Sequence, residues 1–113
     1  MAALDSLKHA RPPRTAVLAD MLELGDDGPD YHREVGRHLS GLGIERVIAV
    51  GELSAHISDN CVSHALHFAN TDQLLADCPE FFQDETILVK GSRGMRLDRF
   101  VTLMTASAGE ATC

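Results

Sequence analysis

The chain of 113 residues has room for one hydrophobic core, and its 44% apolar content is ordinary for a globular domain. Seventeen acidic against ten basic side chains give a formal net charge of -7, which argues against a nucleic-acid partner because a phosphate backbone would be repelled. No apolar stretch is long enough to cross a membrane and the N-terminus lacks a secretory pattern, so we predict a cytoplasmic domain without a membrane span.

The first half of the sequence predicts two helices around one strand. Ala2–His9 carries leucines at helical spacing and ends before two prolines. Arg14–Ala19 is a short apolar run typical of a buried strand, and a polar loop, Asp20–Gly25, follows it. Pro29 then suits the first turn of a helix in which apolar residues recur every three to four positions up to Leu42.

The second half of the sequence continues to alternate strands with helices. The expected segments are a strand over Arg46–Val50, a helix over Leu53–Cys61, a strand over Ala65–Phe68, a helix over Thr71–Cys78, a strand over Thr86–Val89 and a helix with its apolar side along Leu97–Met104. Asn70 is suited to cap the helix that follows it, and the Gln73 side chain can reach back to the same turn. We expect residues 106–113 to form a frayed tail.

This alternation predicts one doubly wound α/β domain over residues 1–113. Short loops between strands and helices imply right-handed crossovers, with helices on both faces of a mainly parallel sheet. Ligands of such sheets bind beyond the carboxyl ends of the strands. The rule selects four candidate loops, which are Asp20–Gly25, Gly51–Leu53, Ala69–Thr71 and Lys90–Gly94.

The loop Lys90–Gly94 is the strongest candidate for a binding site, and it suits an anion. Its two glycines permit tight turns that aim backbone N–H groups outward, while Lys90 and Arg93 add positive charge. The Ser92 hydroxyl, a guanidinium fork and the following helix N-terminus could together hold a carboxylate or a phosphate. The alternative is a polar strand-to-helix turn with solvated basic side chains.

The sequence lacks the glycine-rich motifs of the common nucleotide sites. Neither Gly-x-Gly-x-x-Gly nor Gly-x-x-x-x-Gly-Lys-Ser/Thr is present. A reaction that uses ATP would therefore lack its usual lysine cradle if this chain acted alone. No complete set of acid, base and nucleophile is apparent either, so we predict no catalytic residue.

Asp20 stands at the carboxyl end of the first predicted strand. An acidic side chain at that place can accept hydrogen bonds from a ribose, hold a cation, or cap nearby backbone N–H groups. The residues alone leave these alternatives open.

Cys61, His64 and His67 form a Cys-x-x-His-x-x-His pattern that resembles a set of zinc ligands. Side chains three apart at a strand start point to opposite faces and no fourth ligand is evident, so we predict ordinary surface histidines and no metal site. The odd number of widely spaced cysteines favours free thiols over disulfides. For His32, which has no neighbouring nucleophile to pair with, we predict a structural role facing the loop ends or solvent.

Four segments of the chain together resemble one family. They are AALDSL at the start, VLADMLELG through the first strand, HREVGRHLSGLGIERVIAVG through the second, and ILVKGSRGMRLDRFV near the end. Over most of its length the chain is similar to the C-terminal domain of the MurF-type Mur ligases, and the combination of Asp-Met-x-Glu-Leu-Gly with Val-Lys-Gly-Ser-Arg is specific to them. Ala19 departs from the pattern, because members of the family usually have glycine there; we expect a small change in how closely a ligand approaches.

The resemblance implies a Rossmann-like module of a three-domain cytoplasmic enzyme. In that family the first domain holds a UDP sugar and the central domain holds ATP. With ATP and Mg²⁺ the enzyme converts the carboxylate of UDP-N-acetylmuramoyl-tripeptide to an acyl phosphate, which the amine of D-alanyl-D-alanine attacks, and the third domain swings in to close the site. The matched positions imply that Asp20 approaches the ATP ribose and that Lys90, Gly91, Ser92 and Arg93 approach the dipeptide.

Three classes of function compete for this chain. It could be a ligase domain that depends on its parent's central domain, a small self-standing enzyme, or an independent binding module for a nucleotide or small carboxylate. Ligation by the chain alone would favour the second class, and tight binding of nucleotide or dipeptide would favour the third. We expect the first, with weak binding of D-alanyl-D-alanine and ATP, no bound cofactor and no activity of the isolated chain.

Overall fold

The computed structural model describes residues 2–61, 64–81 and 85–104. The helices are α1 (Ala2–Asp5), α2 (Gly28–Leu42), α3 (Ala55–Asp59) and α4 (Thr71–Ala76), with the 3-10 segments η1 (Ser6–His9), η2 (Leu22–Asp27) and η3 (Arg93–Met95). The strands are β1 (Arg14–Ala19), β2 (Arg46–Val50), β3 (His64–Phe68) and β4 (Thr86–Lys90). Residues 98–104 are also helical. The predicted alternation of strands and helices is confirmed, whereas the tail over residues 106–113 lies outside the described residues.

The described strands form one four-stranded parallel sheet in the order β3-β2-β1-β4. From β1 the chain moves outward through β2 to β3, and it then crosses back to place β4 on the other side of β1. Strand order therefore reverses direction next to β1, which confirms the doubly wound α/β class predicted from the sequence.

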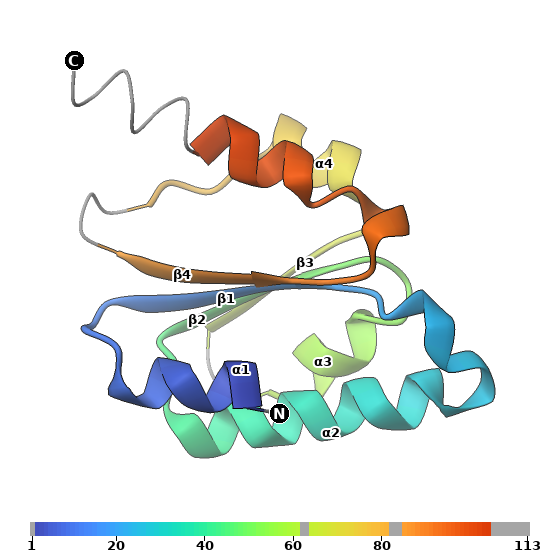
Figure 1. The fold of residues 1–113 in the computed structure, drawn as a ribbon, viewed down its shortest axis with the longest axis horizontal. Helices are drawn as coiled ribbons and strands as arrows, with labels where there is room; N and C mark the ends of the chain where they lie inside the picture. Colours follow the sequence, from blue (N-terminus) through green and yellow to red (C-terminus); the bar gives the residue numbers. More distant parts are fainter. Residues whose placement is uncertain (1, 62–63, 82–84, 105–113) are drawn as a thin grey trace.

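The sheet separates two hydrophobic cores. Figure 1 shows α1, α2 and α3 on one face of the sheet, and α4 with the helix of residues 98–104 on the other. Successive residues of β1 point into different cores, as the pleat of a strand requires: Ala16 and Leu18 join the first core, and Val17 and Ala19 join the second. The methyl group of Ala19 therefore packs inside the protein.

Helix boundaries differ from the prediction in two places. Helix α3 covers Ala55–Asp59 instead of Leu53–Cys61, and α4 ends at Ala76 instead of Cys78. Before α3, residues 51–54 form a turn rather than a helical start. None of the helices in the described residues is long and apolar enough to cross a membrane.

The predicted cap of α4 is present. The Asn70 side chain accepts a hydrogen bond from the Gln73 N–H at 2.8 Å. In return, Gln73 Oε1 accepts one from the Ala69 N–H at 2.6 Å, one residue before the position that the capping box would give. These bonds satisfy N–H groups at the start of the helix and fix the turn after β3.

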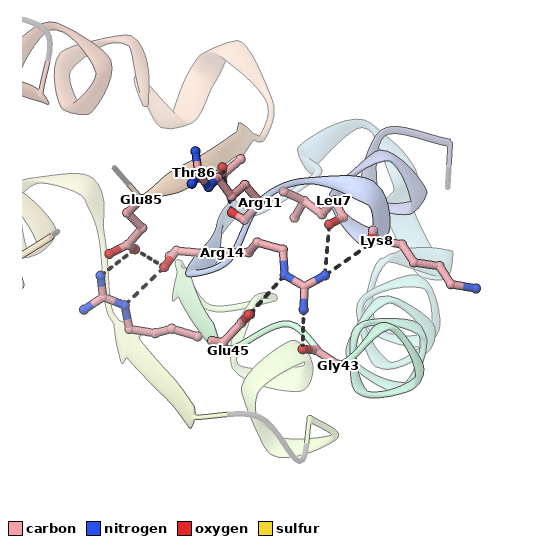
Figure 2. Close-up of polar contacts among 10 residues, drawn as sticks. Leu7, Lys8, Arg11, Arg14, Gly43, Glu45, Glu85 and Thr86 are labelled. Carbon is pink, nitrogen blue, oxygen red and sulfur yellow. Dashed lines mark hydrogen bonds and ion pairs between the residues drawn. The ribbon is translucent and has the colours of Figure 1, made fainter. Parts of the chain in front are cut away.

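At the amino ends of the strands, Arg14 holds three segments together (Figure 2). Its guanidinium donates to the carbonyl oxygens of Leu7, Lys8 and Gly43 at 3.1 to 3.3 Å. Arg14 Nε also donates to the Glu45 carboxylate at 3.1 Å. One side chain of β1 therefore ties the end of η1 and the residue after α2 to the sheet.

Arg46 makes a second ion pair at this end of the sheet. Its Nη2 donates to Glu85 Oε2 at 2.9 Å, and the Glu85 side chain is only 3% exposed. The guanidinium also lies 4.5 Å from the ring centroid of Phe81, and Thr15 donates to the same Glu85 carboxylate. Arg46 thus compensates a buried negative charge while it packs on an aromatic face.

Candidate functional site

Two of the four candidate loops meet where the strand order reverses. The loop after β1 begins at Asp20, and the loop after β4 begins at Gly91. In Figure 1 both leave the same edge of the sheet, and the Ser92 N–H donates to the Asp20 carbonyl oxygen at 3.2 Å. Such a switch point leaves a crevice between diverging loops, and this is where doubly wound proteins bind ligands. The topology therefore joins the two loops that the sequence had singled out separately.

The loop after β1 is held through three successive backbone N–H groups. That of Asp20 donates to the Val50 carbonyl oxygen at 3.2 Å, and that of Met21 donates to His32 Nε2 at 3.1 Å. The third, from Leu22, donates to Ser92 Oγ at 2.8 Å. Strand β2, helix α2 and the loop after β4 each fix one position, so the start of this loop is preorganised.

The Asp20 carboxylate caps the turn before α3. The residue is 5% exposed, and its Oδ1 accepts a hydrogen bond from the Ser54 N–H at 2.7 Å while Oδ2 accepts one from the Leu53 N–H at 3.2 Å. Gly51 makes this approach possible, because a Cβ at that residue would lie 2.5 Å from the carboxylate and its φ is +113°. Asp20 thus caps backbone N–H groups, which was one of the alternatives for this residue. Its contact with a ribose stays a prediction.

The loop after β4 places two cations beside a hollow on the surface. The hollow has a volume of about 520 Å³, and its lining includes Lys90, Ser92, Arg93 and Val101. Lys90 and Arg93 are exposed, and neither side chain hydrogen-bonds or pairs with another described residue. By contrast, Arg96 in the same lining is paired with Asp98 at 3.0 Å. Two cations that make no hydrogen bond or ion pair with the described residues are therefore available to an anion at this edge.

Gly91 is required by close packing beneath the loop. A Cβ at this residue would lie 2.7 Å from the Cβ of Ala19 and 3.2 Å from Leu97 Cδ1. The sequence places Ala19 where the resembled family usually has glycine, and the methyl group sits against Gly91 in the second core. Gly91 thus lets the end of β4 pack closely on β1, and this packing positions the loop of residues 90–94 relative to the sheet.

Ser92 connects the two loops through its hydroxyl group. Ser92 Oγ accepts the Leu22 N–H and donates its own proton to the Glu23 carboxylate. That hydrogen bond is the main cause that lowers the pKa of Glu23, and the positive charge of Lys90 lowers it further. Glu23 therefore remains an anion at neutral pH and lies within the field of the candidate anion site.

His32 is buried and has a structural role. The side chain is 0% exposed, its Nδ1–H donates to the Gly28 carbonyl oxygen at 2.6 Å, and its Nε2 accepts the Met21 N–H. These two bonds require the neutral tautomer with the proton on Nδ1. The expected structural role is supported, and the alternative of a solvent-facing ring is wrong because His32 links the loop after β1 to the start of α2.

The Cys-x-x-His-x-x-His pattern does not bring its members together as ligands. His67 Nε2 lies 2.7 Å from the Gly51 carbonyl oxygen, to which it can donate, and His64 is exposed at the start of β3. Across residues 2–61, 64–81 and 85–104, no three His, Cys, Asp or Glu side chains are grouped so that they could hold a metal ion. Within the same ranges Cys61 and Cys78 are free thiols, while Cys113 lies outside them.

Comparison with known proteins decides the family. The family model of the Mur ligase, glutamate ligase domain, matches residues 1–93. The chain belongs to the Mur ligase C-terminal domain family. The resemblance found in the sequence is therefore confirmed.

Relatives of this Mur ligase domain include two bacterial proteins named UDP-N-acetylmuramoyl-tripeptide--D-alanyl-D-alanine ligase. That of Rickettsia prowazekii is 34% identical over 105 residues, which cover 88% of this chain and 23% of that protein. That of Bacillus subtilis is 37% identical over 91 residues, which cover 75% of this chain and 20% of that protein. A crystal structure of MurF from Acinetobacter baumannii matches with a TM-score of 0.73 and 25% identity, over 96% of this chain and 25% of that chain. The domain thus spans about a quarter of these proteins or less.

Sequence reasoning missed two features of the Mur ligase domain's site. Glu23 stood inside the recognised Asp-Met-x-Glu-Leu-Gly motif, but only the fold reveals that it reaches a serine 69 residues away. The side chain of Ser54, next to α3, has a buried Oγ that finds no hydrogen-bond partner among the described residues. No local pattern predicts either, because both depend on how Asp20 and Ser92 arrange the loops around them.

Proposed function

We propose that this domain supplies the dipeptide-binding part of a ligase that joins D-alanyl-D-alanine to UDP-N-acetylmuramoyl-tripeptide in peptidoglycan precursor synthesis. The observation that carries the proposal is that Lys90 and Arg93, on a loop at the switch point of the sheet, make no hydrogen bond or ion pair with the described residues. The dipeptide ends in a carboxylate, which a guanidinium and an ammonium group recognise through charge-assisted hydrogen bonds. The names of the relatives agree with this substrate.

Other domains of the parent protein would hold the remaining reactants. The sequence contains no P-loop, and the described residues contain no group of three metal-ligating side chains. We therefore assign ATP, Mg²⁺ and the tripeptide chiefly to the central and first domains of a cytoplasmic full-length enzyme. This domain would bring the dipeptide to them when it closes over the central domain, and it would be inactive alone.

The contact between Asp20 and an ATP ribose is a separate part of the proposal. A carboxylate oxygen can accept more than one hydrogen bond, so both oxygens of Asp20 keep some acceptor capacity. However, the residue is 5% exposed, and each oxygen already accepts a backbone N–H from Leu53 or Ser54. A ribose hydroxyl would therefore reach Asp20 only if the turn of residues 51–54 shifts.

The dipeptide contact can be tested on this chain by amide NMR. We expect D-alanyl-D-alanine to shift the amide signals of residues 90–94 with a dissociation constant on the order of millimolar, because half of a closed site offers few contacts. Its C-terminal amide, which lacks the carboxylate, is the matched ligand and should bind at least about tenfold more weakly. Arg93→Gln and Lys90→Gln should each weaken binding of the acid and leave that of the amide unchanged.

Arg37→Gln is the matched control variant for these substitutions. It removes the same charge from an exposed position of α2, where Arg37 is paired with Glu34. Equal weakening by Arg37→Gln and Arg93→Gln would show a general effect of net charge and contradict the proposal. Submicromolar binding of either dipeptide or ATP would instead favour an independent binding module.

A further inference from the structure

We propose that Glu23 is an intramolecular stand-in for the ligand carboxylate, which occupies the Ser92 hydroxyl and must leave before an anion can bind there. The inference rests on the proposed anion site at residues 90–94, and it adds a residue that sets the affinity of that site. The residues that carry it come from the two loops at the switch point.

The first observation is the hydrogen bond itself. The Ser92 hydroxyl donates to Glu23 Oε2, and Glu23 is exposed while Ser92 is half-buried. The same hydroxyl accepts the Leu22 N–H at 2.8 Å, so its oxygen is held in place by the loop that carries Glu23. Ser92 is therefore fixed as a donor that points at a carboxylate beside the hollow.

The second observation is the charge around this contact. The pKa of Glu23 is lowered mainly by the hydrogen bond from Ser92, and the positive charge of Lys90 lowers it further, so a cation of the candidate site acts on this carboxylate. Lys90 and Ser92 also line the hollow, whereas Glu23 itself is not part of the lining. A carboxylate at the edge of the hollow thus already takes the hydroxyl proton of the site and lies within the influence of its cation.

The chemistry of a hydroxyl group makes the two carboxylates compete. Ser92 has a single O–H proton, which cannot be donated to Glu23 and to a ligand at full strength at the same time. Its lone pairs are not consumed by this donation, so the bond from the Leu22 N–H can persist through the exchange. Binding therefore replaces one charge-assisted hydrogen bond by another. Much of the free energy gained from the bond between Ser92 and the ligand is offset by breaking the bond between Ser92 and Glu23.

The exchange predicts which substitution strengthens binding. Glu23→Ala removes the competitor and should tighten the binding of acetate, the simplest carboxylate, by about threefold to tenfold. Asp26→Ala removes the same charge from an exposed position of the same loop, and it should change the affinity for acetate by less than about twofold. Amide signals of residues 90–94 report both affinities, and the measurement is repeated with D-alanyl-D-alanine.

A double-mutant cycle separates competition for Ser92 from simple repulsion. In a Ser92→Ala background, Glu23→Ala should no longer strengthen acetate binding, since the shared donor is gone. If it strengthens binding equally with and without the hydroxyl, or if Asp26→Ala does as much as Glu23→Ala, Glu23 acts only through its charge and the inference is overturned.

A second measurement does not depend on the Ser92 variant. In the unchanged chain, the carboxyl carbon of Glu23 can be titrated by ¹³C NMR with and without saturating trifluoroacetate, a carboxylate that stays ionised at the pH where Glu23 titrates. Displacement from Ser92 should raise the pKa of Glu23 toward its ordinary value of 4.5, and an unchanged pKa would contradict the exchange.

The two probes distinguish failure of the inference from failure of the proposed function. If acetate binding responds to Glu23→Ala as expected but D-alanyl-D-alanine leaves residues 90–94 unshifted in every variant, Glu23 is a stand-in at an anion site that does not take this dipeptide. If neither ligand shifts residues 90–94 even in Glu23→Ala at tens of millimolar, no displaceable carboxylate site exists there.

Discussion

The two ends of the sheet use positive charge in opposite ways. At the amino ends of the strands, Arg14 and Arg46 are each bonded to a carboxylate and to backbone carbonyl oxygens. At the carboxyl ends, Lys90 and Arg93 make no hydrogen bond or ion pair with the described residues. Charges that form ion pairs within the fold contribute to stability, whereas charges beside a hollow that form no such pair with the described residues are available to a ligand. The comparison predicts that substitutions at the two ends affect different measurements.

The largest effect on stability is expected for Arg46→Met. Methionine keeps much of the packing on Phe81 but removes the ion pair that Arg46 makes with the Glu85 carboxylate, whose side chain is 3% exposed. Loss of one partner of a buried pair should lower the free energy of unfolding by about 3 kcal/mol, measured by urea denaturation. Arg37→Met, at an exposed pair on α2, should cost less than about 0.5 kcal/mol. Similar costs for the two variants would contradict a structural role for the amino-end charges.

The carboxyl end also contains one residue whose main role is structural, His32. Its replacement by alanine leaves the Met21 N–H and the Gly28 carbonyl oxygen without their partners and opens a cavity. We expect a loss of about 2 to 3 kcal/mol in the free energy of unfolding and a large shift of the Met21 amide signal. His38→Ala is the control, because His38 lies on the same helix but is partly exposed. Unchanged stability of His32→Ala would mean that the loop after β1 is held by other contacts.

A smaller, pH-dependent effect on the free energy of unfolding is expected from Glu45 at the amino ends of the strands. Hydrogen bonding from Arg14 is the main cause that lowers the pKa of Glu45 from its ordinary value of 4.5. A carboxyl group with a lowered pKa in the folded state stabilises the fold above its unfolded pKa, and this contribution is lost as pH falls through the folded value. Since the Glu45 side chain is 39% exposed, the contribution should stay below about 1 kcal/mol.

The variant Glu45→Gln tests this pH dependence. Its free energy of unfolding should be lower than that of the unchanged chain at pH 6 and should approach it as the pH is lowered below 4.5. Glu34→Gln, at the exposed pair of α2, should show little change between the same pH values. A difference for Glu45→Gln that persists unchanged at low pH would show that its carboxylate charge is not the cause.

Local patterns of the sequence were sufficient for the fold but only partly for the site. Apolar periodicity and the Asn70 cap were confirmed because they depend on residues close in the chain. The start of α3 was misplaced because the Leu53 and Ser54 N–H groups bond Asp20, more than thirty residues away. In the same way, the sequence indicated Ser92 as a ligand contact but could not show that Glu23 already takes its hydroxyl proton. Contacts between loops distant in sequence require the strand order before they can be inferred.

The smallest effect on stability is expected for the double variant Lys90→Gln and Arg93→Gln, which removes the free cations. Both side chains are exposed and make no hydrogen bond or ion pair with the described residues, so their loss should change the free energy of unfolding by less than about 0.5 kcal/mol. The same variant should abolish the binding of D-alanyl-D-alanine. Arg46→Met should show the opposite result, with a lower free energy of unfolding and unchanged dipeptide binding in the folded fraction. If removal of the free cations destabilised the chain as much as Arg46→Met, the positive charge at the carboxyl end would belong to the fold, and the contrast between the two ends would no longer identify a ligand site.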